Sequence, residues 1–204
     1  MGNEFTVSRS GIDLYEVMSA IQKEIRRGNE RNCFLLCLDI IPKYEKYLWR
    51  RLEVIVQEDI GLADPDVIVF VHTQKEIYFE MRAAKKGESY TMVLANTIIR
   101  MCRAKKSRLA DHFHVSLKQK YLADLEKPII PDYAYDKHTR KGKGMGRGWQ
   151  HFLEVGTELK EYHPDAQEDA DRMYAQEFIE VITLIDNGDL PKRPFPPTDQ
   201  RHLF

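Results

Sequence analysis

The residues whose types and spacing most clearly suggest a binding site lie between Thr139 and Trp149, where glycines alternate with basic side chains. A P-loop requires the pattern G-x-x-x-x-G-K-[ST], so that backbone amides surround the phosphates and a hydroxyl group binds magnesium. No Gly-Lys-Ser or Gly-Lys-Thr occurs in the chain. The dinucleotide-binding pattern G-x-G-x-x-G also fails from Gly142 and from Gly144. The spacing therefore argues against nucleotide binding by this segment.

The same segment suits contact with nucleic acid better. No acidic residue lies between Asp136 and Glu154, and basic residues are interleaved with aromatic ones. Cations on a pliable backbone can follow phosphates, and an aromatic ring can stack on a base. The alternative is an ordinary solvated loop whose glycines serve turn geometry. The candidate DNA-binding residues are Lys137, Arg140, Lys141, Lys143, Arg147 and Trp149.

A second group of candidate residues lies at 58–66, where carboxylates cluster. Glu58, Asp59, Asp64 and Asp66 could hold a divalent metal ion. Acidic residues at such a place more often cap a helix start and orient a turn, and we favour that interpretation. No Ser-His-Asp or Cys-His-Asn grouping stands out elsewhere in the sequence. We therefore expect no enzyme, no bound metal and no cofactor.

Composition sets broad limits on the class of protein. The chain has 204 residues, of which 43% are hydrophobic, and 31 basic against 32 acidic residues give a net charge of −1. A real core is expected, and any basic surface must be local. No signal peptide or membrane-spanning run is present, so we expect a cytoplasmic protein without membrane contact. Three sparse cysteines fit a reducing compartment, and we expect them to be buried as small hydrophobes: Cys33, Cys37 and Cys102.

The periodicity of the first half predicts helices. Asp13, with Glu16 three residues later, forms a capping box. Gly28 is expected to end the first helix and Asn29 to cap the second. Apolar residues recur in the first helix at three- and four-residue steps and predict its inner stripe: Ile12, Tyr15, Met18, Ile21 and Ile25.

Further helices are predicted up to residue 128. The second runs to Pro42. The third spans about 43–59 and is stopped by Gly61, with an inner face of Leu48, Leu52, Ile55, Val56 and Asp59. The pattern from 65 to about 84 is ambiguous, because "DVIVFV" has strand propensity. The Asp-Pro start and the residues that follow favour a fourth helix, which Asp64 caps, which has Pro65 at its first position and which ends at Gly87. Ser89 is expected to cap a fifth, and a sixth covers about 106–125. The succession of short helices predicts an all-α bundle.

The chain changes character after the sixth helix. Residues 127–150 contain prolines, glycines and aromatics without a helical period, so an extended strap is expected there. A helix at about 165–185 and a proline-rich tail follow. We therefore predict a domain at 1–150, which includes the strap, and an appendage at 151–204.

One motif resembles a known family closely. The string "QEDIGLADP" at 57–65, which follows the pair Arg50 and Arg51, resembles the C-terminal region of the replication-associated recombination protein A family, AAA+ ATPases also called maintenance-of-genome-stability protein A. Gln57 replaces the small residue that is usual there. Weaker matches in the same order are "AIQKEIRRGNERNCFLLCL" (20–38), "AKKS" (104–107, with Lys105 where proline is usual) and "IIPDYAYDKHTRKGKGMGRGW" (129–149).

The resemblance covers roughly 13–150 and implies a helical collar related to clamp-loader C-terminal domains, through which such ATPases assemble as tetramers at stalled forks and DNA ends. The family's Walker motifs are not in this sequence, and 153–204 has no identified counterpart. Hydrolysis therefore does not carry over, whereas oligomerisation and contact with DNA or a partner do. By the resemblance, the signature turn is architectural: Glu58, Asp59, Gly61, Asp64 and Pro65.

Three functional hypotheses remain. The first is an oligomerisation and interaction module in DNA replication, recombination or repair. Met1 and the unmatched C-terminal third favour a standalone protein, such as a phage- or plasmid-borne subunit that co-assembles with a host clamp-loader-like ATPase. The second is a sequence-nonspecific DNA-binding protein that uses 137–149. The third is an enzyme, in which Glu58, Asp59 or a histidine would converge in a pocket.

Overall fold

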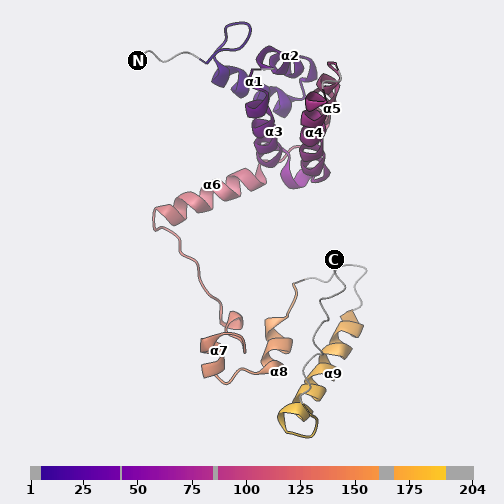
Figure 1. Ribbon diagram of the computed structural model, residues 1–204. Helices are drawn as coiled ribbons and strands as arrows, with labels where there is room; N and C mark the ends of the chain where they lie inside the picture. The colour runs from indigo at the N-terminus through magenta and orange to yellow at the C-terminus, as the bar shows by residue number, and fades with distance from the viewer. Residues whose placement is uncertain (1–5, 42, 85–86, 161–167, 192–204) are drawn as a thin grey trace. The chain divides into compact units, whose positions relative to one another are not determined.

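The computed structural model describes residues 6–41, 43–84, 87–160 and 168–191, with the side chains of 168–171 left out (Figure 1). The contacts divide the chain into two compact units, 1–127 and 128–204. Within the described residues no β-strand forms, apart from one isolated bridge between Val7 and Asp13. The predicted all-α class is therefore confirmed.

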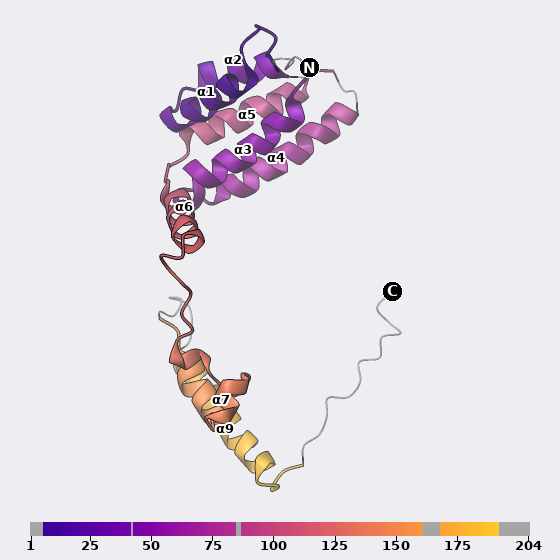
Figure 2. The ribbon, with the colours of Figure 1, turned by 90° about the vertical axis from the view of Figure 1, so that its left-hand side faces the viewer.

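The first unit is a bundle of helices. It contains α1 (Leu14–Arg27), α2 (Glu30–Ile40), α3 (Glu45–Asp59), the 3-10 turn η1 (Gly61–Ala63), α4 (Asp66–Ala83), α5 (Tyr90–Arg103) and α6 (Leu109–Leu122). Helices α3, α4 and α5 run beside one another, with α1 and α2 against them (Figure 2). Helix α6 leaves the bundle at its edge and contacts α3 and η1.

Local signals set most of the helix ends. The Asp13 carboxylate accepts hydrogen bonds from the amides of Tyr15 (2.8 Å) and Glu16 (3.2 Å), which satisfies two free donors of the first turn. Gly28 ends α1 in the left-handed region (φ 74°), and the Asn29 side chain then caps α2. These predicted caps are confirmed.

Two predicted caps are wrong. The Asp64 side chain does not cap α4, whose preceding residue is Pro65, and Ser89 makes no side-chain cap on α5. Asp64 instead forms a two-pronged ion pair with Arg100, whose two parallel bonds engage both carboxylate oxygens. The backbone carbonyl of Asp64 accepts from the amide of Val67 (3.1 Å) and supplies part of the missing cap.

The core of the first unit follows the predicted helix faces. All five positions predicted on the inner face of α3 are buried: Leu48, Leu52, Ile55, Val56 and Asp59. In α1, Met18, Ile21 and Ile25 are buried as predicted. Ile12 and Tyr15 are exposed, because Ile12 precedes the cap and the inner face runs through Leu14 and Val17 instead. The three cysteines are free thiols and buried, as predicted.

The second unit corrects the predicted strap. Residues 127–150 were expected to be extended, but they contain η2 (Asp132–Ala134), α7 (Arg140–Gly144) and the start of α8 (Trp149–His151). Thr139 caps α7 by accepting from the Gly142 amide (3.0 Å). A Cβ at Gly142 would lie 1.9 Å from the carbonyl oxygen of Asp136, so this glycine allows a close backbone contact rather than an open strap.

The remaining elements of this unit are a π-helical turn, η3 (Phe152–Gly156), and α9 (Glu168–Asp186). Helix α9 confirms the helix expected at 165–185, except that 165–167 lie outside the described residues. Most of the expected proline-rich tail, 192–204, also lies outside them. Residues 128–150 group with those that follow them, and a domain boundary at 150 stays a prediction. Within the described ranges, no helix is both long and apolar enough to cross a membrane.

Candidate functional site

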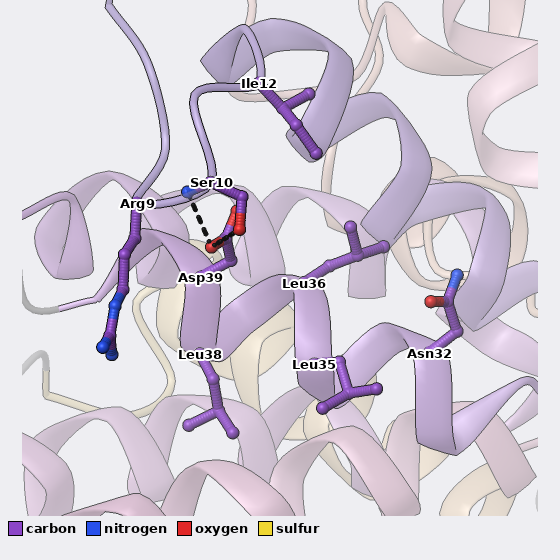
Figure 3. Close-up of a pocket in the computed structure, with 8 residues that line it drawn as sticks. All are labelled: Arg9, Ser10, Ile12, Asn32, Leu35, Leu36, Leu38 and Asp39. Atoms are coloured by element: carbon purple, nitrogen blue, oxygen red, sulfur yellow. Dashed lines mark hydrogen bonds between the residues drawn. The ribbon is translucent and has the colours of Figure 1, made fainter.

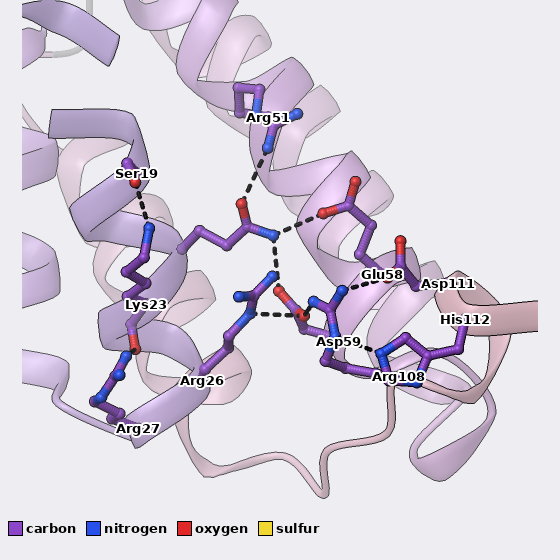
Figure 4. A network of polar contacts seen from close by, with 11 residues as sticks. Ser19, Lys23, Arg26, Arg27, Arg51, Glu58, Asp59, Arg108, Asp111 and His112 are labelled. Atoms are coloured by element: carbon purple, nitrogen blue, oxygen red, sulfur yellow. Dashed lines mark hydrogen bonds and ion pairs between the residues drawn. The ribbon is translucent and has the colours of Figure 1, made fainter. Parts of the chain in front are cut away.

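The signature turn is organised around a buried carboxylate, Asp59, which is 1% exposed (Figure 4). Its Oδ1 accepts from Nε of Arg26 and from Nη1 of Arg108, each at 2.8 Å. Its Oδ2 accepts from Nε2 of Gln22 at 3.0 Å. Its backbone carbonyl accepts from the Ser107 amide at 3.0 Å. Asp59 therefore joins α1, the end of α3 and the segment that starts α6.

The neighbouring motif residues extend this network. Gln22 also donates to Glu58 (2.6 Å) and accepts from Nη2 of Arg51 (3.2 Å), which explains one member of the paired arginines. Arg108 also contacts the carboxylate of Asp111, one turn into α6. We call these residues the Asp59 network: Gln22, Arg26, Arg51, Glu58, Asp59, Arg108 and Asp111.

The second half of the turn is held from α5. The two terminal guanidinium nitrogens of Arg100, Nη1 and Nη2, donate to the Asp64 carboxylate at 2.9 and 3.0 Å. This hydrogen-bonded pair holds the pKa of Asp64 below its usual range. Gly61 has φ 49°, so it permits the tight reversal between α3 and α4.

Lys106 is a structural residue that the sequence analysis missed. Its ammonium donates to the carbonyl oxygens of Met101 (2.8 Å), Cys102 (2.9 Å) and Ala104 (2.7 Å). These are free acceptors at the C-terminal end of α5, and desolvation there lowers the pKa of Lys106. A lysine just after a predicted helix end, within the "AKKS" match, was the signal that could have identified this cap.

The carboxylates of the signature turn connect it to other helices and do not form an open site for a metal ion. Glu58, Asp59 and Asp64 each accept hydrogen bonds from side chains of other elements. Across the described part of the chain, no three His, Cys, Asp or Glu side chains group so that they could hold a metal ion. The network instead fixes where α6 begins relative to the bundle.

In the basic segment, Arg147 is engaged within the second unit. Its Nη1 donates to the carbonyl oxygens of Asp132 (2.6 Å) and Tyr135 (2.8 Å), and its Nη2 pairs with the Asp132 carboxylate (2.5 Å). The side chain is only 16% exposed. Arg147 therefore ties the connection between α7 and α8 to η2 rather than extending into solvent.

Two lysines of the segment lie over aromatic rings. The ammonium of Lys137 is 3.3 Å from the centre of the Trp149 ring, and that of Lys141 is 3.9 Å from the centre of the Tyr135 ring. Trp149 is half-buried and packs edge-to-face on Phe178 of α9 with ring centres 4.9 Å apart. Cation–π contacts of this kind contribute about 0.5–1 kcal/mol each at exposed sites. Trp149 thus joins α8 to α9 and is already occupied on one face by Lys137.

Arg140 and Lys143 are placed differently from the other candidates. Both lie on α7 and are exposed, and neither has an ion pair or ring contact with any described residue. The structure therefore divides the six candidates into these two solvent-facing cations and four side chains that take part in contacts within the unit: Lys137, Lys141, Arg147 and Trp149.

His138 and Asp136 form the polar centre of the second unit. The Asp136 carboxylate accepts from the His138 amide (2.9 Å) and lies 3.0 Å from the imidazole Nδ1. The side-chain hydrogen bond from His138 holds the pKa of Asp136 below its usual range. The His138 ring also packs edge-to-face on Phe152 with ring centres 4.7 Å apart.

The described surface includes two open depressions. One, of about 420 Å³, lies between the N-terminal loop and α2, and its Asp39 carboxylate is already bound by the amide (3.0 Å) and hydroxyl (2.7 Å) of Ser10 (Figure 3). The other, of about 500 Å³, lies in the second unit beside α9 and is lined by Trp149 and His151 among others. Neither gathers the carboxylates of the signature turn.

Comparison with known proteins identifies the family. The family model for the C-terminal region of MgsA AAA+ ATPases matches residues 42–180, a range that includes the signature turn and the basic segment. Replication-associated recombination protein A of Bacillus subtilis (strain 168) is 31% identical over 175 residues, which cover 79% of this chain and 38% of that relative. The match thus spans well under half of the relative's length. The family seen in the sequence is confirmed, but the predicted limit at about 150 is not: the match continues to residue 180, so 153–180, for which no counterpart was identified, belong to the family region. The chain belongs to the family of MgsA AAA+ ATPase C-terminal domains.

Proposed function

We propose that this chain is a non-catalytic oligomerisation and interaction module that acts in DNA replication, recombination or repair. The observation that carries the proposal is the Asp59 network. In it the buried carboxylate of the signature turn pairs with Arg26 and with Arg108, which immediately precedes α6. That helix has no buried residue of its own. A buried ion pair that positions a helix with no buried side chain suits an assembly role better than a catalytic one.

The name of the matched relative supports the biological setting, since it describes a replication-associated recombination protein. The matched region is the C-terminal part of an ATPase family. We therefore propose homo-oligomerisation, as a tetramer, as the primary interaction, with an AAA+ ATPase of the same family as a further partner. Both would use the first unit, whose core is closed and can present a fixed surface.

The proposal is tested by the mass of the full chain in solution, measured by light scattering over a range of concentrations with and without single-stranded and forked DNA. We expect a mass above that of one chain (24.0 kDa) without DNA. A single-chain mass at every concentration, unchanged by either DNA, would contradict the proposal.

A second candidate function is sequence-nonspecific DNA binding through α7, favoured by the exposed and unengaged side chains of Arg140 and Lys143. Each phosphate contact on a single strand contributes about 0.7 to the slope of log affinity against log salt. The double variant Arg140→Gln/Lys143→Gln should lower that slope by about 1.4. The matched control is Lys118→Gln/Lys120→Gln on α6, which should leave it unchanged. An unaltered slope in the α7 variant would remove this helix from DNA binding.

A further inference from the structure

The start of α3 carries basic and aromatic residues around a third depression, of about 310 Å³, in the first unit. We call the six residues that line it the α3 basic surface: Lys43, Tyr44, Glu45, Lys46, Tyr47 and Arg50. The three cationic side chains are exposed, whereas the two tyrosines and the glutamate are partly buried. The surface shares no residue with the Asp59 network or with the basic segment at 137–149.

The three cations have no anionic partner in the part of the chain that the structure describes. Lys46 and Arg50 are four residues apart, so they share one face of α3. Nε of Arg50 donates to the Lys46 carbonyl oxygen (3.3 Å), which holds the guanidinium group along that face. Lys43 lies just before the helix, and its ammonium is 4.9 Å from the centre of the Tyr44 ring.

The one carboxylate that lines the depression is already engaged. Oε2 of Glu45 accepts from Nε of Arg82 (2.6 Å) and from the hydroxyl group of Tyr78 (3.2 Å), both on α4. Its negative charge is therefore offset by Arg82 rather than by the three cations of the α3 basic surface. An exposed cluster of three uncompensated positive charges attracts an anionic ligand.

We propose that the α3 basic surface binds a single strand of nucleic acid, with its phosphates on the three cations and its bases against the two tyrosine rings. Cations that follow phosphates, combined with rings on which bases stack, are the means by which proteins hold single strands. Tyr44 and Tyr47 pack against the core of the first unit, so the rings are held in place for stacking. An acidic peptide would use the charges alone.

This inference goes beyond the proposed assembly function, and its surface lies in the other unit from α7. Lys46 and Arg50 are about 6 Å apart along the helix axis, so a strand lying along α3 would meet Arg50, Lys46 and Lys43 in turn. Each phosphate contact on a single strand contributes about 0.7 to the slope of log affinity against log salt. Three contacts therefore predict a contribution of about 2.1.

The test is the triple variant Lys43→Gln/Lys46→Gln/Arg50→Gln in the full chain. Its binding to a dye-labelled oligothymidylate is measured by fluorescence anisotropy over a range of salt concentrations. We expect the slope to fall by about 2.1 and the affinity at low salt to fall by about tenfold or more. The matched control removes three exposed cations at scattered positions on α1, α2 and α6 and should leave the slope unchanged: Lys23→Gln/Arg31→Gln/Lys118→Gln.

Two further probes separate a nucleic-acid strand from an acidic peptide. An abasic oligonucleotide of the same length keeps the phosphates and lacks the bases, and a polyglutamate peptide of equal charge lacks both. We expect the wild type to bind each of them about fivefold or more weakly than oligothymidylate, because the stacking contribution is lost. Equal binding of polyglutamate would overturn nucleic acid as the ligand.

The outcomes also separate this inference from the proposed assembly function. The triple variant should keep the wild-type mass in light scattering and the wild-type midpoint in urea unfolding. A wild type that binds no oligothymidylate, an unchanged slope in the triple variant, or an equal fall in the control would each overturn the α3 basic surface as the site and leave the assembly function standing. A fall in affinity accompanied by a loss of mass would overturn it as well, because the surface would then serve assembly.

Discussion

The two units of this chain are built in different ways. The first has a continuous core of buried apolar side chains that includes Trp49 and Tyr78. In the described part of the second unit, Gly142 is the only buried residue. That unit is connected instead by side-chain to backbone bonds from Arg147, by cations over rings, and by edge-to-face aromatic contacts around Trp149.

The two kinds of contact stabilise their units to different extents. Burial of a whole apolar side chain contributes about 1.5–3 kcal/mol, whereas a cation–π or aromatic contact at a partly exposed site contributes about 0.5–1.5 kcal/mol. The first unit should therefore behave as a rigid platform and the second as a region that opens locally at lower cost.

The largest effect is expected in the core of the first unit. Ile21 on α1 has no exposed surface, so Ile21→Ala should lower the free energy of unfolding by about 2–5 kcal/mol. Urea unfolding measures it as a lower midpoint with an unchanged slope. The matched change in the second unit is Val155→Ala, at a side chain that is 39% exposed, and it should have a much smaller effect. Equal losses would remove the distinction between the units.

The Asp59 network should give the next effect. Asp59→Asn removes the only negative charge shared by Arg26 and Arg108, and we expect a loss of about 3 kcal/mol in unfolding free energy. This lies at the low end for a broken buried pair, because both guanidinium groups are partly exposed. Asp64→Asn breaks the more exposed pair with Arg100 and should lower the free energy of unfolding by less than Asp59→Asn does. A reversed order would mean that Asp59 is not the anchor.

A smaller and local effect is expected at Gly142. A Cβ there would collide with the backbone of Asp136, and such overpacking costs about 1–3 kcal/mol. Trypsin cleaves after the basic residues of this segment, and its rate follows the open population, so Gly142→Ala should raise cleavage at 140–147 by roughly 5- to 150-fold. Gly144→Ala is the control, because no atom lies within 4 Å of its added Cβ. Equal cleavage of the two variants would contradict the close contact.

The smallest effect concerns pH. The pKa of Asp136 is lowered in the folded chain, so its pair with His138 stabilises the second unit above the unfolded pKa, and this contribution is lost as the pH falls through the folded value. The relevant window therefore lies below about pH 4. The two indole N–H signals in NMR report on separate units, Trp49 on the first and Trp149 on the second.

In the acid titration, the Trp149 signal should shift in that window through its neighbour His138, and Asp136→Asn should abolish the shift. A Trp149 signal that titrates identically in the wild type and in Asp136→Asn would show that this carboxylate is not responsible.

Local signals accounted for most of the first unit. Asp13, Gly28 and Asn29 act through neighbours in sequence, so their caps could be predicted. The burial of Asp59 could also be predicted from the sequence, because Asp59 shares the helical spacing of Leu52 and Ile55. Its ion-pair partners could not be predicted, since Arg26 and Arg108 are 33 and 49 residues away in the chain. For the same reason Asp64 was expected to cap a helix, whereas it pairs with Arg100, 36 residues later.

The second unit was less predictable because its helical turns depend on contacts rather than on periodicity. Four glycines between 142 and 148 disfavour a helix by intrinsic propensity. The Thr139 cap and the approach of Asp136 to Gly142 nevertheless form α7. The same contacts engage Arg147 and Trp149, which the sequence could not distinguish from the solvent-facing Arg140 and Lys143.

The main proposal is that copies of this chain assemble through the fixed surface of the first unit. Hydrogen exchange of the full chain, measured by mass spectrometry at a dilute and at an assembled concentration, tests this most directly. We predict that assembly slows exchange within the first unit and leaves the exchange of α7, in the second unit, unchanged. Exchange throughout the first unit that stays the same while the mass of the protein rises would contradict the proposal.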